Sequence, residues 1–208
     1  MARYTEAVCR LCRREKIKLY LKGPKCDTQK CPVERRPYPP GEHGRDRIRQ
    51  GSEYLGQLRE KQKARRIYGV LEKQFANMYE EANRSQGITG ENLLRMLELR
   101  LDNIIYRAGW GSSRNQSRQM VCHGHVLVNG KRVDIPSFRV RKGDVVSLHQ
   151  KARQMIVVRH NLDTIDRRVP PWLDGDPTSY EITVRDLPMR EHIDLPVREQ
   201  LIVELYSK

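Results

Sequence analysis

The dipeptide Asn129-Gly130 constrains the fold of this chain most, because it is typical of a two-residue turn that joins two antiparallel strands. Apolar residues at 126–128 and the pair at 132–133 flank this turn and form the two predicted strands. A second turn is expected at Lys142-Gly143-Asp144, directly before the apolar stretch 145–148. The sequence therefore predicts an antiparallel sheet over this part of the chain.

A short basic helix is predicted just before the hairpin. Ser113 is a favourable N-cap, and Gln116 follows at the spacing of a capping box. Arg114 and Arg118 are four residues apart and share one helix face, and Gly124 supplies the residue that ends the helix. Because the helix end and the hairpin both carry cations, we expect a compact surface for a phosphate backbone.

The charge of the chain agrees with a polyanionic partner. There are 40 Lys and Arg residues against 26 Asp and Glu, which gives a net charge of +14. Residues 1–50 and 111–160 each carry a net charge of +8, whereas the stretch 161–208 carries −4. Two concentrated basic blocks favour nucleic acid as the partner over a merely solvated basic surface. The acidic tail favours contact with a basic protein, for which Glu199 and Glu204 are the candidates.

Four cysteines at the N-terminus have the spacing of a metal-binding knuckle, with the pattern C-x2-C-x13-C-x4-C. The candidate ligands are Cys9, Cys12, Cys26 and Cys31. We expect one structural zinc ion, with a 4Fe–4S cluster as the alternative and two disulfides as the third possibility. The chain has neither a bilayer-length apolar run nor a signal-peptide pattern, so we expect a cytoplasmic protein with reduced thiols and no membrane partner.

Two further features of the sequence are the fifth cysteine and a proline-rich segment. Cys122 is interpreted as a buried helix residue. Residues 32–44 contain four prolines, so an extended segment is expected that is either a linker or an RNA-contacting arm. The arm would use Arg35, Arg36 and Arg45, with His43 as a further cation and a conceivable metal ligand.

Three helices are expected between the arm and the hairpin. The first is capped by Ser52, ends at Gly69 and carries five cations within eight residues, which face either phosphate or solvent. The second spans about 71–82, and the third runs without a break from the N-cap Thr89 to Gly109. After the sheet we expect a helix ended by Pro170, short strands at 172–173 and 180–184, and a C-terminal helix opened by 196–197.

The predicted fold class is α+β: a mostly helical first domain with an inserted helix-plus-antiparallel-sheet RNA-binding domain and an N-terminal four-cysteine knuckle. The predicted boundaries are 1–45 for the knuckle and basic arm, 46–88 plus 185–208 for the helical domain, and 89–184 for the insertion. The RNA-binding module itself would span about 97–160.

Several stretches together resemble one family, that of bacterial small-subunit (30S) ribosomal protein four, also called uS4. The resemblance rests on the cysteine knuckle, ERRPYPPGEHG (34–44), LREKQKARRIYG (58–69), LELRLDNIIYRAG (97–109), the helix–hairpin 113–133 and EQLIVELYSK (199–208). It covers essentially the whole chain. The helix–hairpin alone resembles a module that also occurs in pseudouridine synthases, tyrosyl-transfer-RNA synthetases and a heat-shock RNA-binding protein.

The resemblance implies a structural component of the small ribosomal subunit that binds 16S ribosomal RNA, starts assembly of the subunit body and influences translational accuracy. It also implies contact with small-subunit protein five and other 30S proteins, and messenger RNA nearby where it enters the subunit. No catalytic residue is expected, and the alternatives are an RNA-modifying enzyme or a stress RNA chaperone that shares the module. The candidate RNA-binding residues are Arg35, Arg36, Arg45, Arg59, Lys61, Lys63, Arg65, Arg66, Arg114, Gln116, Arg118, His123, Lys131 and Arg132.

Overall fold

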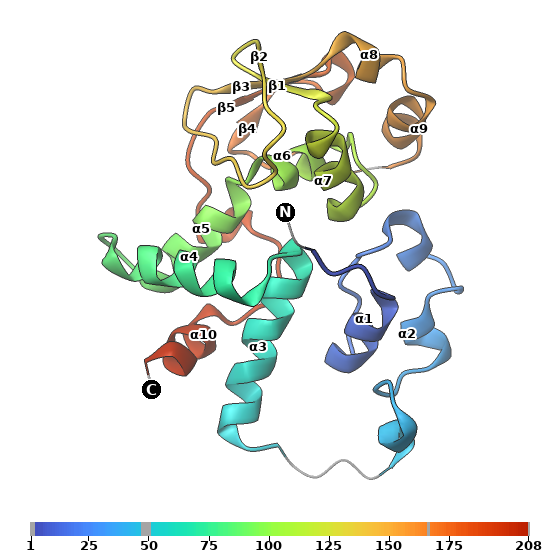
Figure 1. Ribbon diagram of the computed structural model, residues 1–208, viewed down its shortest axis with the longest axis vertical. Coiled ribbons are helices and arrows are strands. Elements are labelled where there is room, and N and C mark those ends of the chain that lie inside the picture. The colour runs from blue at the N-terminus through green and yellow to red at the C-terminus, as the bar shows by residue number, and fades with distance from the viewer. Residues whose placement is uncertain (1–2, 47–50, 166, 208) are drawn as a thin grey trace. The chain divides into compact units, whose positions relative to one another are not determined.

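A computed structural model describes residues 3–46, 51–165 and 167–207 of the chain (Figure 1). The chain forms two compact units, residues 1–93 with 195–208 and residues 94–194. The second unit is thus inserted into the first, and its ends lie five and ten residues beyond the predicted boundaries at 89 and 184. The N-terminal 45 residues belong to the first unit. No described helix has both the length and the apolar character needed to cross a membrane.

The first unit is built on three helices, α3 (Glu53–Tyr68), α4 (Glu72–Arg84) and α10 (Glu199–Tyr206). α3 begins and ends as predicted, because the Ser52 hydroxyl accepts a hydrogen bond from the Leu55 amide and Gly69 adopts a left-handed conformation with φ 66°. α10 packs along α3 (Figure 1). α10 begins at Glu199, after the predicted start at 196–197.

The N-terminal arm contains α1 (Cys9–Glu15), η1 (Gly23–Cys26), α2 (Pro32–Arg35) and η2 (Glu42–Arg45). The prediction that residues 32–44 stay extended is wrong for α2. Pro32 occupies the first position of this helical turn, where the missing amide proton is not needed and the fixed φ is already suitable. Cys31 precedes α2 in an extended conformation, so the turn begins directly after the last cysteine of the knuckle.

The predicted helix from Thr89 to Gly109 is two helices, α5 (Thr89–Glu98) and α6 (Leu101–Arg107). Backbone bonds to residues 139 and 140 cause the break between the two helices. The amide of Val140 donates to the carbonyl of Leu99 at 3.0 Å, and Arg100 forms a β-bridge with Arg139. These bonds hold Arg100 extended, with ψ 137°, so the helix cannot continue. Thr89 is the first residue of α5 rather than its N-cap.

The second unit contains a five-stranded antiparallel sheet with the order β2-β1-β3-β5-β4. Its strands are β1 (Val126–Val128), β2 (Lys131–Arg132), β3 (Val145–Leu148), β4 (Leu173–Asp174) and β5 (Glu181–Val184). Asn129 and Gly130 both have positive φ, 49° and 76°, as the predicted two-residue turn requires. The α+β class is therefore confirmed.

Helices cover this sheet and close the core of the second unit (Figure 1). They are α6, α7 (Arg114–Cys122), α8 (Gln150–Arg153) and α9 (Ile156–Thr164), with short 3-10 turns η3 (Pro177–Ser179) and η4 (Arg190–His192). The helix expected after Leu148 is divided into α8 and α9 by an extended Met155, and it ends before Pro170. Trp110 and Trp172 are both fully enclosed in this core.

Candidate nucleic-acid interface

The hairpin presents its cations to solvent, as the sequence predicts. Lys131 and Arg132 form β2 and both are exposed. The Arg132 guanidinium lies directly over Gly124, where an added Cβ would approach its Nε to 2.0 Å. Gly124 is needed for its φ of 69° after α7, whereas the exposed Arg132 side chain is flexible and can move aside for a Cβ. The Arg132 guanidinium thus lies beside the end of α7.

Three histidines lie next to Arg132 at this end of the sheet. The rings of His123 and His125 are 6.0 Å apart, and the His149 amide donates to the His125 carbonyl at 2.9 Å. Burial lowers the pKa of His125 from 6.5, and the neighbouring His123, His149 and Arg132 lower it further. His123 is exposed, so it is the histidine available to a ligand. Cys122, at the end of α7, is also exposed, so the prediction that it is buried is wrong.

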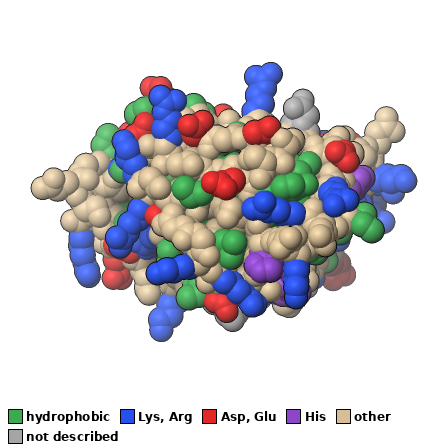
Figure 2. Space-filling model, turned by 90° about the horizontal axis from the view of Figure 1, so that it is seen from above, with side chains coloured by type: hydrophobic (Ala, Val, Ile, Leu, Met, Phe, Trp, Pro, Cys, Tyr) green, Lys and Arg blue, Asp and Glu red, His purple; other side chains and the backbone are tan. Residues whose placement is uncertain are grey.

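The other end of these strands carries cations that the sequence reading missed. Asn129 donates through Nδ2 to the Asp144 carboxylate at 2.9 Å and accepts from the Val145 amide at 2.9 Å. These bonds bring the turn with exposed Arg141 and Lys142 beside the hairpin turn, where Lys142 is paired with Asp186 at 2.5 Å. Figure 2 shows Lys and Arg side chains over the visible face, with histidines and carboxylates among them. The pairing of β1 with β3 could have indicated Arg141. The turn that contains it comes directly before β3 and must therefore lie beside the hairpin turn that ends β1.

Arg118 does not face solvent. Its side chain is buried, and Nη1 lies 3.1 Å from Oδ2 of Asp102, whose carboxylate also binds Arg100 at 3.1 and 2.7 Å. One buried carboxylate thus holds two guanidinium groups from α7 and from the start of α6. The geometry corrects the predicted RNA contact: Arg118 fastens α7 to the core of its unit.

Arg114 and Gln116 also make bonds inside the second unit. The half-buried Arg114 donates through Nε to Oδ1 of Asn103 at 2.9 Å and stacks 4.2 Å from the Tyr106 ring centroid. Gln116 Oε1 accepts from the Ser112 amide at 2.6 Å, one residue before the N-cap, and from Asn161 Nδ2 at 3.1 Å. The solvent face of α7 is instead polar and uncharged, and its exposed residues are Asn115, Gln119 and Cys122.

All five cations predicted on α3 form ion pairs within the first unit. Lys61 and Arg65 bind Glu72 at the start of α4, and Lys63 lies 2.5 Å from Glu60. Arg59 and Arg66 both bind Glu15 at the end of α1. Four of these cations therefore attach the arm and α4 to α3, and Lys63 is paired within α3. The solvated interpretation does not describe them, and their contact with phosphate stays a prediction.

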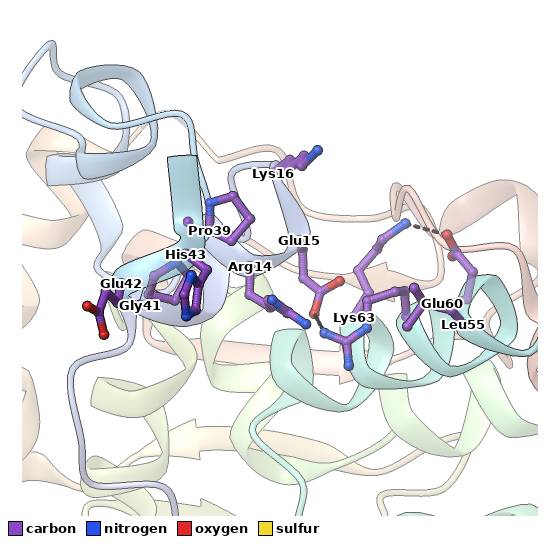
Figure 3. Close-up of a pocket in the computed structure, with 13 residues that line it drawn as sticks. Arg14, Glu15, Lys16, Pro39, Gly41, Glu42, His43, Leu55, Glu60 and Lys63 are labelled. Carbon is purple, nitrogen blue, oxygen red and sulfur yellow. Dashed lines mark hydrogen bonds and ion pairs between the residues drawn. The ribbon is translucent and has the colours of Figure 1, made fainter. Parts of the chain in front are cut away.

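Glu15 is the buried centre of this attachment, with a side chain that is 1% exposed. Burial raises the pKa of its carboxyl group, and the charges of Arg59 and Arg66 act in the opposite direction. Figure 3 shows Glu15 between the arm and α3, at a hollow of about 590 Å³ that Lys16, Lys63 and His43 also line. His43 binds Asp46 at 2.7 Å and is well exposed.

The four N-terminal cysteines line one small pocket between α1, η1 and α2. All are free thiols, and burial raises the pKa of Cys12 to about 11, with the other three thiols adding to the shift. Within the described ranges, no group of three or more His, Cys, Asp or Glu side chains has the arrangement of a metal site. The cysteines are thus brought to one place, while a metal geometry is not shown.

The remaining predicted residues lie on the arm and on α10. Arg35, Arg36 and Arg45 are exposed, and Arg45 also donates to the Tyr38 hydroxyl at 3.1 Å and stacks over its ring. On α10, the exposed Glu204 accepts from Gln57 of α3 at 3.0 Å, so one carboxylate oxygen of the predicted protein contact is used within the unit. The half-buried side chain of Glu199 passes next to Gly90, where an added Cβ would come within 2.8 Å of it.

Fold and surface together define a nucleic-acid-binding protein in which an α+β module with a basic hairpin is inserted into a helical unit. Residues 3–98 match the family described as ribosomal protein S4/S9 N-terminal domain, and residues 99–146 match the S4 domain. The chain is 61% identical to small ribosomal subunit protein uS4 of Acidothermus cellulolyticus and 58% identical to that of Thermoanaerobacter pseudethanolicus. Both alignments cover the whole of both chains. The chain belongs to the uS4 family of small ribosomal subunit proteins.

Proposed function

We propose that this protein is a structural component of the small ribosomal subunit that binds 16S ribosomal RNA, nucleates assembly of the subunit body and contributes to translational accuracy. The observation that carries the proposal is the family match over the full chain, at 54–61% identity to proteins named small ribosomal subunit protein uS4. The uS4 family is one of structural proteins, which supports a role without catalysis.

The hairpin geometry supports a physical mechanism for RNA binding. Lys131 and Arg132 directly follow the two-residue turn, in a strand that pairs with β1, and the Arg132 side chain lies over Gly124. Cations on such a rigid scaffold displace condensed counterions from phosphates, so affinity falls steeply with salt. Folded RNA is recognised mainly by shape and by backbone contacts. The protein would therefore bind a preformed RNA junction by matching its phosphate positions.

The proposed partners beyond RNA are small-subunit protein five and other 30S proteins, with messenger RNA nearby. The exposed carboxylate of Glu204 and the acidic tail support a contact with a basic protein. A cross-linking experiment on assembled subunits tests this proposal, with cross-links from α10 to a neighbouring protein as the expected result.

A zinc ion held by Cys9, Cys12, Cys26 and Cys31 is part of the proposal. Its support is the donor set: four free thiols from separate segments line one apolar pocket in a short, polar arm. Bound zinc would stabilise the arm. Elemental analysis after anaerobic purification should find one zinc per chain. Iron with sulfide would favour the 4Fe–4S alternative, and absence of both metals would refute a metal site.

Co-sedimentation separates the structural role from an RNA-modifying enzyme or a stress RNA chaperone. A structural protein should be present once per assembled small subunit. A substoichiometric amount, or a protein found only on free ribosomal fragments, would contradict the proposed function.

A further inference from the structure

Asn129 is held in the hairpin turn by three hydrogen bonds to Asp144 and Val145. Its backbone amide donates to the Val145 carbonyl at 2.8 Å, and its Oδ1 accepts from the Val145 amide at 2.9 Å. Its Nδ2 donates to Oδ1 of Asp144 at 2.9 Å. These three bonds form the Asn129 clasp. The other oxygen of the Asp144 carboxylate accepts from the Arg141 amide at 2.7 Å, so the acceptor is itself held in place.

The residue after Asn129 leaves this asparagine open to a reaction with its own backbone. Asn129 is followed by Gly130, and no other asparagine of the chain precedes a glycine. Both residues are exposed, and a Cβ added at Gly130 would meet no atom within 4 Å. Because glycine has no side chain, the Gly130 nitrogen is not shielded from the Asn129 side chain. Asparagine is also one of the thermolabile residues of proteins.

The reaction joins the Gly130 backbone nitrogen to Cγ of Asn129. The nitrogen loses its proton as the new bond forms, the bond between Cγ and Nδ2 breaks, and Nδ2 leaves with that proton as ammonia. Water then opens the five-membered ring at one of its two carbonyl groups. The products are aspartate or isoaspartate, so one amide and one water become one carboxylic acid and one ammonia, without an oxidant or a reductant.

We propose that Asn129 is a site of isoaspartate formation and that the clasp, through Asp144, keeps the reaction slow in the folded chain. For the ring to close, Cγ must turn toward the Gly130 nitrogen, and this movement breaks both side-chain bonds of the clasp. The bond to Asp144 has an ionised acceptor, which makes it the stronger of the two. Asp144 is therefore the protecting residue of this site.

The product acts against the hairpin, and this consequence rests on the proposed function. A carboxylate in place of the Asn129 amide accepts hydrogen bonds but does not donate them, so it loses the bond to Asp144. Two negative charges then face each other between the two turns, and the new charge lies close in sequence to the exposed Lys131. Weaker binding of RNA follows. The partner that such a site fits is an enzyme that methylates isoaspartyl carboxylates.

The test follows isoaspartate in the full chain incubated at neutral pH, by peptide mapping and by labelling with an isoaspartyl methyltransferase. Asp144→Ala should raise the rate at Asn129 by about three- to tenfold in the folded chain, which is the effect of losing one hydrogen bond. In urea, where the clasp is absent, the wild type and this variant should react at the same rate. The exposed Asp134→Ala change is the matched control and should react like the wild type. Peptide mapping separates this site from Asp174-Gly175, where the same ring can form from aspartate.

Several results would overturn the inference. Absence of isoaspartate at Asn129 even in urea would refute the site. Equal rates in the folded wild type and in Asp144→Ala would refute protection by the clasp. Asp144→Asn keeps an oxygen acceptor and should react at a rate near that of the wild type, and a rate as high as that of Asp144→Ala would show that the hydrogen bond is not the cause.

RNA binding distinguishes these results from failure of the proposed function. Asn129→Asp should bind a transcript of the 5′ domain of 16S ribosomal RNA less tightly than the wild type does. Equal affinity of the two proteins would refute the consequence for the hairpin. Absence of binding by the wild-type chain would refute the proposed function, whereas the rates of isoaspartate formation would still decide the chemical site.

Discussion

Replacement of Asp102 by Asn tests whether the arginines of α7 belong to the core rather than to the RNA surface. The Asp102 carboxylate is 6% exposed and is the acceptor for both Arg100 and Arg118. An amide at this position would remove the negative charge that both buried guanidinium groups bind. Removal of one partner of a buried ion pair costs about 3–5 kcal/mol, so we expect a loss of this size in the stability of the second unit.

Urea unfolding followed by tryptophan fluorescence measures this loss directly. Both tryptophans of the chain, Trp110 and Trp172, lie in the core of the second unit, so the signal reports that unit alone. With a urea dependence of about 2 kcal/mol per molar, the midpoint should fall by about 2 M. The exposed Asp163→Asn change in the same unit is the matched control and should leave the midpoint unchanged.

The same variant separates stability from RNA contact. In conditions where Asp102→Asn stays folded, its salt slope for ribosomal RNA should equal that of the wild type, because no phosphate contact has been removed. A loss of less than about 1 kcal/mol would refute the argument from the buried pair. A slope lower by about 0.7 to 0.9 in Arg118→Gln, in conditions where that variant stays folded, would show that Arg118 contacts phosphate.

Four further changes test other parts of the account. Lys131→Gln/Arg132→Gln should lower the salt slope by about 1.4 to 1.8 in filter binding, and an unchanged slope would remove the hairpin from the interface. Glu15→Gln should destabilise the attachment of the arm to α3 by about 3 kcal/mol, seen as faster proteolysis within residues 16–46; wild-type rates would contradict this. Burial lowers the pKa of His125, so as the pH falls the unfolded chain binds a proton at this residue before the folded chain does. The stability that neutral His125 contributes is therefore present above pH 6.5 and is lost as the pH falls below it. His125→Asn should therefore flatten the decline of stability between pH 7 and 5, and an equal decline in both proteins would refute this. Cys122 should react with a thiol reagent before the buried Cys12, Cys26 and Cys31, and Cys122→Ser should abolish this fast phase.

Local signals in the sequence were sufficient at several places where the structure depends on adjacent residues. The cap at Ser52 and the stop at Gly69 fix α3, and Asn129-Gly130 fixes the hairpin, because each acts through the backbone within a few residues. In β1 the buried Val126 and Val128 alternate with Leu127, which agrees with the predicted strand. These features placed the cations of the hairpin correctly on an exposed turn.

Features that depend on distant partners could not be read in this way. The sequence shows the charge of Arg66 but not that Glu15, 51 residues earlier, lies beside it, nor that Asp102 binds Arg118. The break between α5 and α6 likewise comes from the bond of Leu99 with Val140, 41 residues later. A cation on a helix can meet phosphate, water or a carboxylate, and only the tertiary structure decides among them.

The central claim is that cations on a rigid scaffold recognise a preformed ribosomal RNA shape. Competition binding at about 0.15 M salt tests it most directly, with the 5′ domain of 16S ribosomal RNA against an RNA of equal length and composition in shuffled order. The account predicts a preference of at least about a thousandfold for the ribosomal RNA, the lower end of the range for specific recognition by proteins that bind nucleic acid. Equal affinity for the two RNAs would contradict it.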